Sequence, residues 1–254
     1  MNKFLLTVSY DGTNYCGYQL QNDKPTVALM LNNATKEAFG FECNVTGCSR
    51  TDSGVHALGF KVTVQPKCEN DKITVPVSKI PIAMNLKLPD DIVVLDAKEV
   101  SDDFHARYSV TSKEYVYKIH DSAIQNPFYR NLVLEYGKKI TDKSIARMNE
   151  ACTYFIGTHE FDSFMASGSK IEDTTRTVYS AKVTRNGDIV EFSVCADGFL
   201  YNMVRIMVGT LLKVESGKLQ PNDIKKIISS KNRTLAGTTA KPCGLYLKNV
   251  QYDS

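Results

Sequence analysis

A short stretch of the chain combines several residue types that catalysis uses. Residues 47–57 include Arg50, Asp52 and His56, together with two glycines. Carboxylate and imidazole groups can transfer protons or attack a substrate, and a guanidinium can pair with a carboxylate or a phosphate. Only one residue separates Arg50 from Asp52, so both reach a single pocket only on an irregular backbone, which glycine permits. The stretch therefore fits either a catalytic loop or an ordinary charged turn.

Predicted strands and helices must position this loop. β-Branched residues bounded by glycine and proline predict strands on either side of it, at residues 44–48 and 59–64. The same signals predict further strands at residues 3–10, 92–100, 112–120, 175–185, 188–196 and 244–250. Apolar residues at helical spacing predict helices at residues 27–40, 76–84, 144–154, 201–214 and 223–228.

Local signals place several boundaries of these elements. Thr26 is an N-cap candidate for the first helix, which ends near Gly40. Thr74 is a cap candidate for the helix at residues 76–84. Asn186-Gly187 is the strongest short-range turn signal in the chain and predicts a tight hairpin.

The succession of elements falls into two halves of similar character. Residues 1–125 read strand, helix, strand, strand, helix, strand, strand, and they contain the loop with Asp52. Residues 126–254 again mix strands and helices. We therefore expect an α+β protein with antiparallel sheets, composed of an N-terminal half over 1–125 and a C-terminal half over 126–254.

The composition is that of an ordinary globular protein. Of the 254 residues, 43% are hydrophobic and 23% are charged, and a net charge of +3 neither requires nor excludes a nucleic-acid partner. The seven cysteines include no CxxC pair, which predicts reduced thiols in a cytosolic protein. The first residues show no signal-peptide pattern, and no apolar run approaches the length of a membrane span.

Motifs of several other enzyme classes are missing from the sequence. It has no GxxxxGK[ST] phosphate loop and no GxGxxG motif. The four histidines show no HExxH or HxH spacing, which disfavours a metal enzyme. Residues 167–170 match SxxK without any supporting motif, and we do not expect a catalytic serine there.

Blocks spread over nearly the whole chain resemble the tRNA pseudouridine synthase A family. Residues 50–57, RTDSGVHA, resemble the signature loop of that family. Further blocks match in the same order at residues 10–21, 85–92, 102–108, 115–117, 203–211, 231–240 and 244–247. Each block alone is weak to moderate evidence, whereas together in register they are strong evidence. The chain has Tyr18 and Leu20 where the family usually has tryptophan and arginine, and the change at Leu20 removes a candidate phosphate contact.

The resemblance implies a fold, a reaction and a substrate. The fold is the pseudouridine synthase fold, with two ferredoxin-like-derived α+β halves joined across a central cleft. The reaction converts uridine to pseudouridine at positions 38, 39 and 40 in the anticodon stem-loop of tRNAs, without cofactor or metal. The target base must leave the stack before a protein group can reach its ribose carbon. The resemblance also implies a homodimer in which one tRNA contacts both subunits, and we expect a cytoplasmic protein.

The resemblance assigns roles to five residues. Asp52 is the essential carboxylate, which either attacks as a nucleophile or removes a ribose proton. Arg205 forms an ion pair with Asp52 and keeps it ionised, and Arg50 holds the flipped conformation or fills the vacated stack. Tyr115 stacks on the target uracil, and Leu245 forms the apolar floor under the base.

Alternatives remain for the protein and for its single residues. The chain could be an RNA-binding protein without activity, or a cofactor-free hydrolase that uses Asp52 and His56. Arg205 could pair with a structural acid, Arg50 could contact a phosphate, and Tyr115 and Leu245 could be core residues. We expect His56 and His105 to form hydrogen bonds or contact RNA rather than to act as bases. The candidate phosphate contacts, each of which could equally be a solvated charge, are Arg107, Arg176, Lys138 and Lys139.

Overall fold

The computed structural model describes residues 2–168 and 171–253, and the chain forms two compact units. Unit 1 extends to Thr111 and includes the chain again from Tyr246 onward, whereas unit 2 is Ser112–Leu245. The last strand counts with unit 1 from Tyr246 onward, where Tyr246 pairs with His56, whereas its first residue, Leu245, is the last residue of unit 2. The predicted functional halves divide instead at 125/126, and that division stays a prediction. Ser169 and Lys170 of the SxxK match lie outside the described residues.

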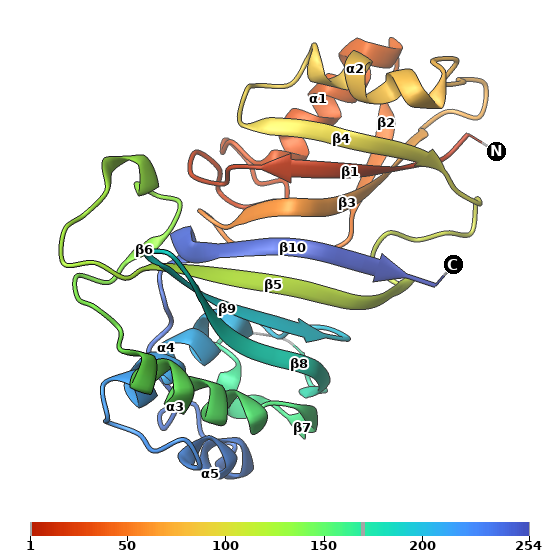
Figure 1. Cartoon of the computed structure of the whole chain (residues 1–254). Coiled ribbons are helices and arrows are strands. Elements are labelled where there is room, and N and C mark those ends of the chain that lie inside the picture. Colours follow the sequence, from red (N-terminus) through yellow and green to blue (C-terminus); the bar gives the residue numbers. More distant parts are fainter. Residues whose placement is uncertain (1, 169–170, 254) are drawn as a thin grey trace. The chain divides into compact units, whose positions relative to one another are not determined.

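Unit 1 is built on a mostly antiparallel sheet (Figure 1). Its strands follow the order β4-β1-β3-β10, and β2 pairs with β3 as well. Strand β10 runs parallel to its neighbour β3. The strands are β1 (Phe4–Tyr10), β2 (Cys43–Gly47), β3 (His56–Pro66), β4 (Ile92–Glu99) and β10 (Leu245–Tyr252).

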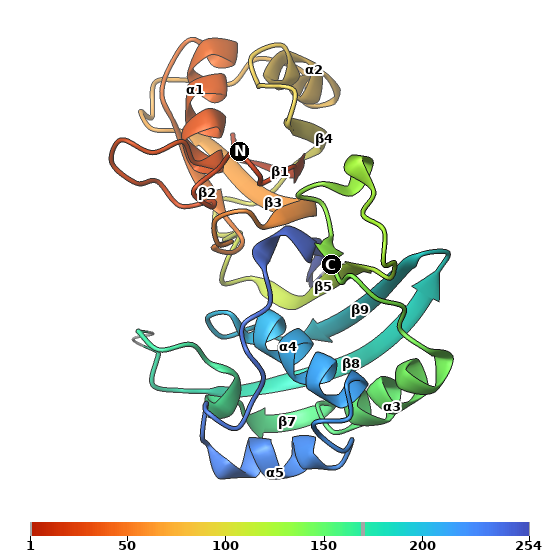
Figure 2. The same ribbon diagram turned by 90° about the vertical axis from the view of Figure 1, so that its left-hand side faces the viewer.

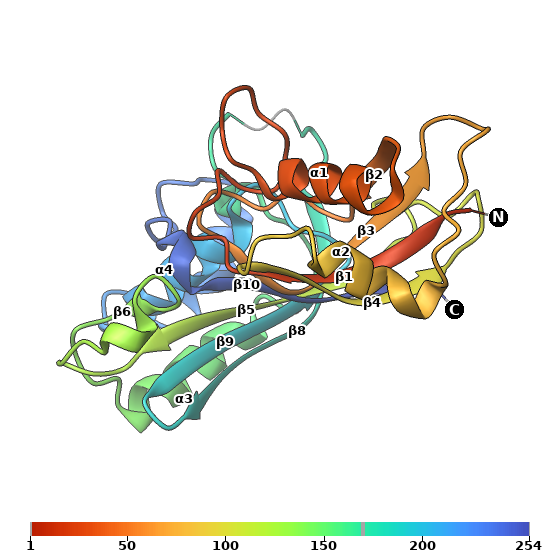
Figure 3. The same ribbon diagram turned by 90° about the horizontal axis from the view of Figure 1, so that it is seen from above.

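Helices α1 (Val27–Phe39) and α2 (Ile80–Asn85) lie side by side over this sheet (Figure 3). The Thr26 hydroxyl accepts the Leu29 N–H and caps α1, as predicted. Gly40 ends the helix in the left-handed region at φ 83°, a conformation that glycine adopts without strain. The buried stripe of α1 includes Leu31, which is 0% exposed, and full burial of such a side chain stabilises the fold by about 1.5–3 kcal/mol.

The single helix predicted at residues 76–84 is instead two short pieces. A 3-10 turn, η1 (Val77–Lys79), precedes α2, and Thr74 caps neither of them. Pro81 lies in the first turn of α2. Because proline has no N–H to bond back to the preceding turn, a regular α-helix cannot run through this position and begins at Ile80.

In unit 2 the strands follow the order β5-β9-β8-β7, and each neighbouring pair in this order is antiparallel. Short β6 runs parallel to β5 at its edge. Gly187, at φ 62°, turns the predicted hairpin between β8 and β9. Sequence reasoning did not identify β6 and β7, which are short. The strands are β5 (Val110–His120), β6 (Leu134–Glu135), β7 (Gly157–Glu160), β8 (Thr175–Asn186) and β9 (Ile189–Ala196).

Three helices accompany the sheet of unit 2 in the part of the chain that the structure describes (Figure 2). Helix α3 (Asp142–Thr153) is capped by Thr141 and packs on α4 (Met203–Glu215) and on β8. Helix α4 is buried along most of its length, and α5 (Asp223–Ser230) contacts β7. The α+β class is confirmed, and the seven cysteines are not joined in disulfides.

Candidate active site

The loop that carries Asp52 joins β2 to β3 in unit 1. The two strands pair in antiparallel register, with Gly47 opposite Val62, and the Cys48 N–H then donates to the Lys61 carbonyl at 2.9 Å. A Cβ at Gly47 would lie 2.5 Å from the Tyr18 ring, so only glycine lets that ring pack against the strand end. The loop therefore starts from a fixed strand pair.

Contacts to Thr51 fix the chain just before Asp52. The hydroxyls of Tyr10 and Thr51 are hydrogen-bonded at 2.8 Å, and the Tyr18 N–H donates to the Thr51 carbonyl at 3.1 Å. Gly17 has φ +84°, and a Cβ there would lie 2.4 Å from the Thr51 carbonyl oxygen. The opening loop of the chain thus lies directly against the peptide that precedes Asp52.

A second set of contacts fixes the chain just after Asp52. The Ser53 hydroxyl and the Gly54 N–H both donate to the Tyr15 carbonyl, at 3.1 and 3.4 Å. A Cβ at Gly12 would lie 2.0 Å from the Val55 carbonyl oxygen. Asp52 is half-buried on a backbone held from both sides, which suits a carboxylate that must meet a substrate atom in one geometry.

Arg50 and His56 occupy different surroundings at the two ends of this loop. Arg50 is exposed, so its guanidinium lies where a solvent-borne ligand could meet it. His56 is 1% exposed and stacks on Tyr246 at 4.6 Å. Its Nδ1 lies 3.0 Å from both the Gly12 N–H and an Asp11 carboxylate oxygen. We favour acceptance from the Gly12 N–H, because that bond is buried and Asp11 is partly exposed; His56 thus forms hydrogen bonds, as expected.

Tyr115 lies on β5 in unit 2, opposite Val194 of β9. It is 7% exposed and meets Phe199 edge to face, with ring centroids 5.1 Å apart. Tyr117, two residues along the strand and on the same face, donates its hydroxyl to the Lys241 carbonyl at 2.7 Å. Burial raises the pKa of Tyr117, so this phenol keeps its proton and serves as a structural donor.

Hydrogen bonds from its guanidinium fix the side chain of Arg205. From the first turns of α4 it donates Nη1 to the Asn202 side-chain oxygen and Nε to the Ala240 carbonyl, both at 2.7 Å. The Ala240 N–H donates in return to the Arg205 carbonyl at 3.1 Å. An arginine near the start of a mostly apolar helix needs such partners, because unpaired polar groups are costly to bury.

The segment before Ala240 packs on α4 backbone to backbone. A Cβ at Gly209 would lie 1.8 Å from the Thr238 carbonyl oxygen, and one at Gly237 would lie 2.1 Å from the Gly209 backbone. The Gly237 N–H also donates to the Thr210 hydroxyl at 2.8 Å. This close approach fixes the carbonyl that receives the Arg205 Nε.

Arg233 fastens the same segment, a role that sequence reasoning missed. Its guanidinium donates to the Gly237 carbonyl at 2.8 Å and to the Thr239 hydroxyl at 3.2 Å, and burial lowers its pKa. The residue lies inside a sequence block that resembles the family, but the block alone indicates no partner. Leu245 follows this segment and is 6% exposed.

The five predicted site residues are thus divided between the units. Arg50 and Asp52 belong to the loop of unit 1, whereas Tyr115, Arg205 and Leu245 belong to unit 2. Within unit 2, the segment from Ala240 to Leu245 accepts hydrogen bonds from both Arg205 and Tyr117, and Tyr117 lies two residues after Tyr115 on β5.

The four candidate phosphate contacts differ in their surroundings. Lys138 pairs with Glu215 at 2.9 Å, and Lys139 lies 3.3 Å from Asp121. Arg176 donates to the Asp173 carbonyl at 3.1 Å. The exposed Arg107 lies in unit 1.

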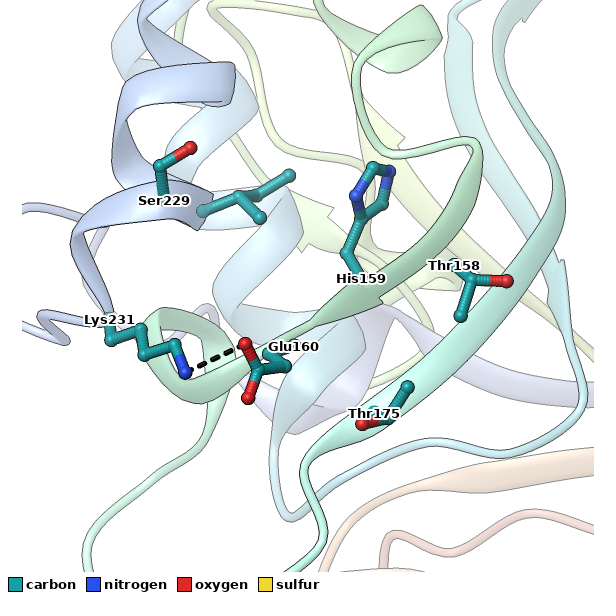
Figure 4. Close-up of a pocket in the computed structure, with 7 residues that line it drawn as sticks. Thr158, His159, Glu160, Thr175, Ser229 and Lys231 are labelled. Carbon is teal, nitrogen blue, oxygen red and sulfur yellow. Dashed lines mark ion pairs between the residues drawn. The ribbon is translucent and has the colours of Figure 1, made fainter.

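A polar depression in unit 2, between β7 and α5, contains none of the predicted site residues (Figure 4). Lys231 and Glu160 form an ion pair across it at 2.7 Å. No cluster of three or more potential metal ligands occurs among the residues that the structure describes. Likewise, none of the helices in residues 2–168 and 171–253 combines the length and apolarity of a membrane span.

Comparisons with known proteins identify relatives of this chain. A family model described as tRNA pseudouridine synthase matches residues 6–109 and 151–253. The chain is 46% identical to tRNA pseudouridine synthase A of Thermoanaerobacter sp. strain X514, 42% to that of Caldicellulosiruptor saccharolyticus and 41% to that of Bacillus pumilus. Each alignment covers 99% of this chain and 100% of the relative.

A solved structure titled as a Cbf5-Nop10-Gar1 complex also matches this chain. The match covers 96% of this chain and 57% of the other, with a TM-score of 0.37 and 14% identity.

Proposed function

We propose that this chain, which belongs to the tRNA pseudouridine synthase family, forms pseudouridine at positions 38, 39 and 40 of the tRNA anticodon stem-loop. The family is one of isomerases that convert uridine to pseudouridine in tRNA. The proposal adds the positions in the tRNA, the residues that act and the absence of a cofactor.

The placement of Asp52 is the observation that carries the proposal. Asp52 lies in the first segment that matches the family, half-buried in a loop whose backbone is held on both sides. Pseudouridine formation breaks the bond between the ribose and a uracil nitrogen, turns the base and joins it again through carbon. An ionised carboxylate can act in this reaction in either of two ways, by attack on the substrate or by removal of a ribose proton.

The other four residues would handle the flipped nucleotide. Arg50 is exposed at the loop and would hold the flipped conformation or fill the vacated stack, since flipping costs a few kcal/mol that protein contacts must offset. Tyr115 would stack on the uracil, and Leu245 would support it from below. Arg205 would pair with Asp52 and keep it ionised. These roles rest on the sequence resemblance, and the firm anchoring of Arg205 by Ala240 and Asn202 supports its part.

The proposal extends to the assembly and its location. The protein would act in the cytoplasm as a homodimer, with one tRNA contacting both subunits. Light scattering should give about twice the chain mass of 28.3 kDa. A mass of one chain for the free protein, together with one chain per complex when tRNA is bound, would contradict the dimer.

Replacing Asp52 by alanine tests the mechanism. We expect Asp52→Ala to slow pseudouridine formation about ten-thousandfold or more, because both proposed routes need the carboxylate. tRNA affinity should stay within about tenfold, since phosphate contacts elsewhere supply most of it. Pseudouridine content and tRNA binding are measured on the same samples. Activity that survives in the variant would refute the role of Asp52.

A further inference from the structure

We propose that Tyr15 and Asp91 are positioning residues that hold the loop of Asp52 through the Tyr15 carbonyl. The inference rests on the proposed function, because it concerns the loop of the same site. Neither residue would touch the substrate. Their hydrogen bond would determine where the residues after Asp52 lie, and so how well the carboxylate meets the reacting atom.

Asp91 is a fixed point in the turn that leads into β4. Its carboxylate accepts the Tyr15 hydroxyl on one oxygen and the Asn14 side-chain amide, at 3.2 Å, on the other. Its backbone carbonyl accepts the Asp11 N–H at 2.9 Å. The loop of residues 11–15 is therefore tied to this turn at three points.

Tyr15 connects this turn to the loop that carries Asp52. Its carbonyl is the shared acceptor for the Ser53 hydroxyl and the Gly54 N–H, at 3.1 and 3.4 Å. Its N–H donates to the Gly12 carbonyl at 3.1 Å. Without the hydrogen bond to Asp91, the Tyr15 carbonyl could move. The Ser53 hydroxyl and the Gly54 N–H, which donate to it, would move with it.

The chemistry of the pair suits a permanent anchor. Tyr15 is 6% exposed, and burial together with the Asp91 carboxylate raises the pKa of its phenol. The hydroxyl therefore keeps its proton at neutral pH and remains a donor. A hydrogen bond from a hydroxyl to a carboxylate is stronger than one between neutral groups.

Tyr15→Phe tests the anchor, because it removes only the hydroxyl. We expect kcat to fall about ten- to a hundredfold, the effect of a small misplacement at a reacting centre, with KM for tRNA within about twofold. Tyr136→Phe is the matched control: Tyr136 donates its hydroxyl to Glu215 at 2.5 Å in unit 2, and burial likewise raises its pKa. The control should leave kcat unchanged, although it loses the same type of bond.

Variants at Asp91 show whether the two residues act as a pair. Asp91→Ala should slow the reaction at least as much as Tyr15→Phe, because it also removes the bond from Asn14. The double variant should be no slower than Asp91→Ala, because the bond between Tyr15 and Asp91 is lost only once. Asp91→Asn keeps an acceptor and should restore kcat to within about threefold of the wild type. Additive losses in the double variant, or a wild-type kcat in Tyr15→Phe, would overturn the proposal. A rise in KM alone would overturn it too, because it would indicate a substrate contact.

Hydrogen exchange separates this inference from the proposed function. The Gly54 amide should exchange at least about fivefold faster in Tyr15→Phe than in the wild type or in Tyr136→Phe. Unchanged exchange would overturn the anchor, whatever the activity. If the wild-type protein formed no pseudouridine, the proposed function would fail and the catalytic part of this inference with it, while the exchange result would still decide whether Tyr15 holds the loop.

Discussion

The loop that carries Asp52 in unit 1 and the helix that carries Arg205 in unit 2 are both firmly held, but different parts of them are fixed. Around Asp52 the neighbouring residues bind the main chain, for example at the Thr51 carbonyl. Around Arg205 they bind the guanidinium itself, through Ala240 and Asn202. The position of the Asp52 carboxylate should therefore change when residues that hold its backbone are replaced. The position of the Arg205 guanidinium should change when the guanidinium itself is replaced by a group with other donors.

Changes at Arg205 should therefore have the larger effect. We expect the single-turnover rate of pseudouridine formation to fall about a hundredfold or more in Arg205→Ala and about tenfold or more in Arg205→Lys, because lysine keeps the charge but lacks the Nε donor and the planar fork. Arg147→Lys is the control, since Arg147 is also half-buried in unit 2 and donates to the Leu219 carbonyl at 3.2 Å. A wild-type rate in Arg205→Lys would contradict the direct fixation of the side chain.

A change in the backbone around Asp52 should have an intermediate effect. In Gly12→Ala the new Cβ would meet the Val55 carbonyl oxygen, so the loop must shift, and we expect the rate to fall about tenfold with a loss of about 1–3 kcal/mol in stability. Gly40→Ala is the control in the same unit, because Gly40 has open space around it and a Cβ there would meet no neighbour, although its φ of 83° is unfavourable for alanine. Rate and thermal unfolding are measured together.

The control should lose stability alone, because its strain lies at the end of α1. Equal rates per folded molecule in both glycine variants would show that the backbone around Asp52 does not determine turnover.

Two buried tyrosines give the smallest effects, and these should have opposite signs. Tyr18 stacks on Phe60 in unit 1, and its hydroxyl has no hydrogen-bond partner among the described residues, whereas the Tyr117 hydroxyl in unit 2 binds the Lys241 carbonyl. Tyr117→Phe should lower the free energy of unfolding by about 1–2 kcal/mol, since it leaves a buried carbonyl without its donor. Tyr18→Phe should leave stability unchanged or raise it by about 1 kcal/mol. Denaturant unfolding measures both, and a similar loss in each would contradict this assignment.

Much of the fold could be predicted because its signals are local. The Thr26 cap, the left-handed end at Gly40 and the Asn186-Gly187 hairpin each depend on a few consecutive residues. The break in the helix around Pro81 was missed, although the residue that causes it is visible in the sequence. Short strands such as β7 are set by their neighbours in the sheet rather than by their own four residues.

The candidate site was predictable in its residue types but not in its supports. Asp52 and Arg205 lie in blocks that resemble the family, so the sequence indicated them. The bond between Tyr15 and Asp91 joins residues 76 positions apart, and no spacing rule connects them. The guanidinium of Arg233 donates to residues only four and six positions further along the chain. These bonds form only because residues 237–240 pack against α4, which local spacing does not indicate.

Mapping pseudouridine at single-nucleotide resolution shows which uridines of a tRNA this protein converts. The substrate is an unmodified tRNA with uridine at positions 38, 39 and 40 and elsewhere, incubated with the wild-type protein alone and with Asp52→Ala as the inactive control. We predict pseudouridine at positions 38, 39 and 40 only, formed without any added cofactor. Pseudouridine outside the anticodon arm, or none at all, would refute the proposed function.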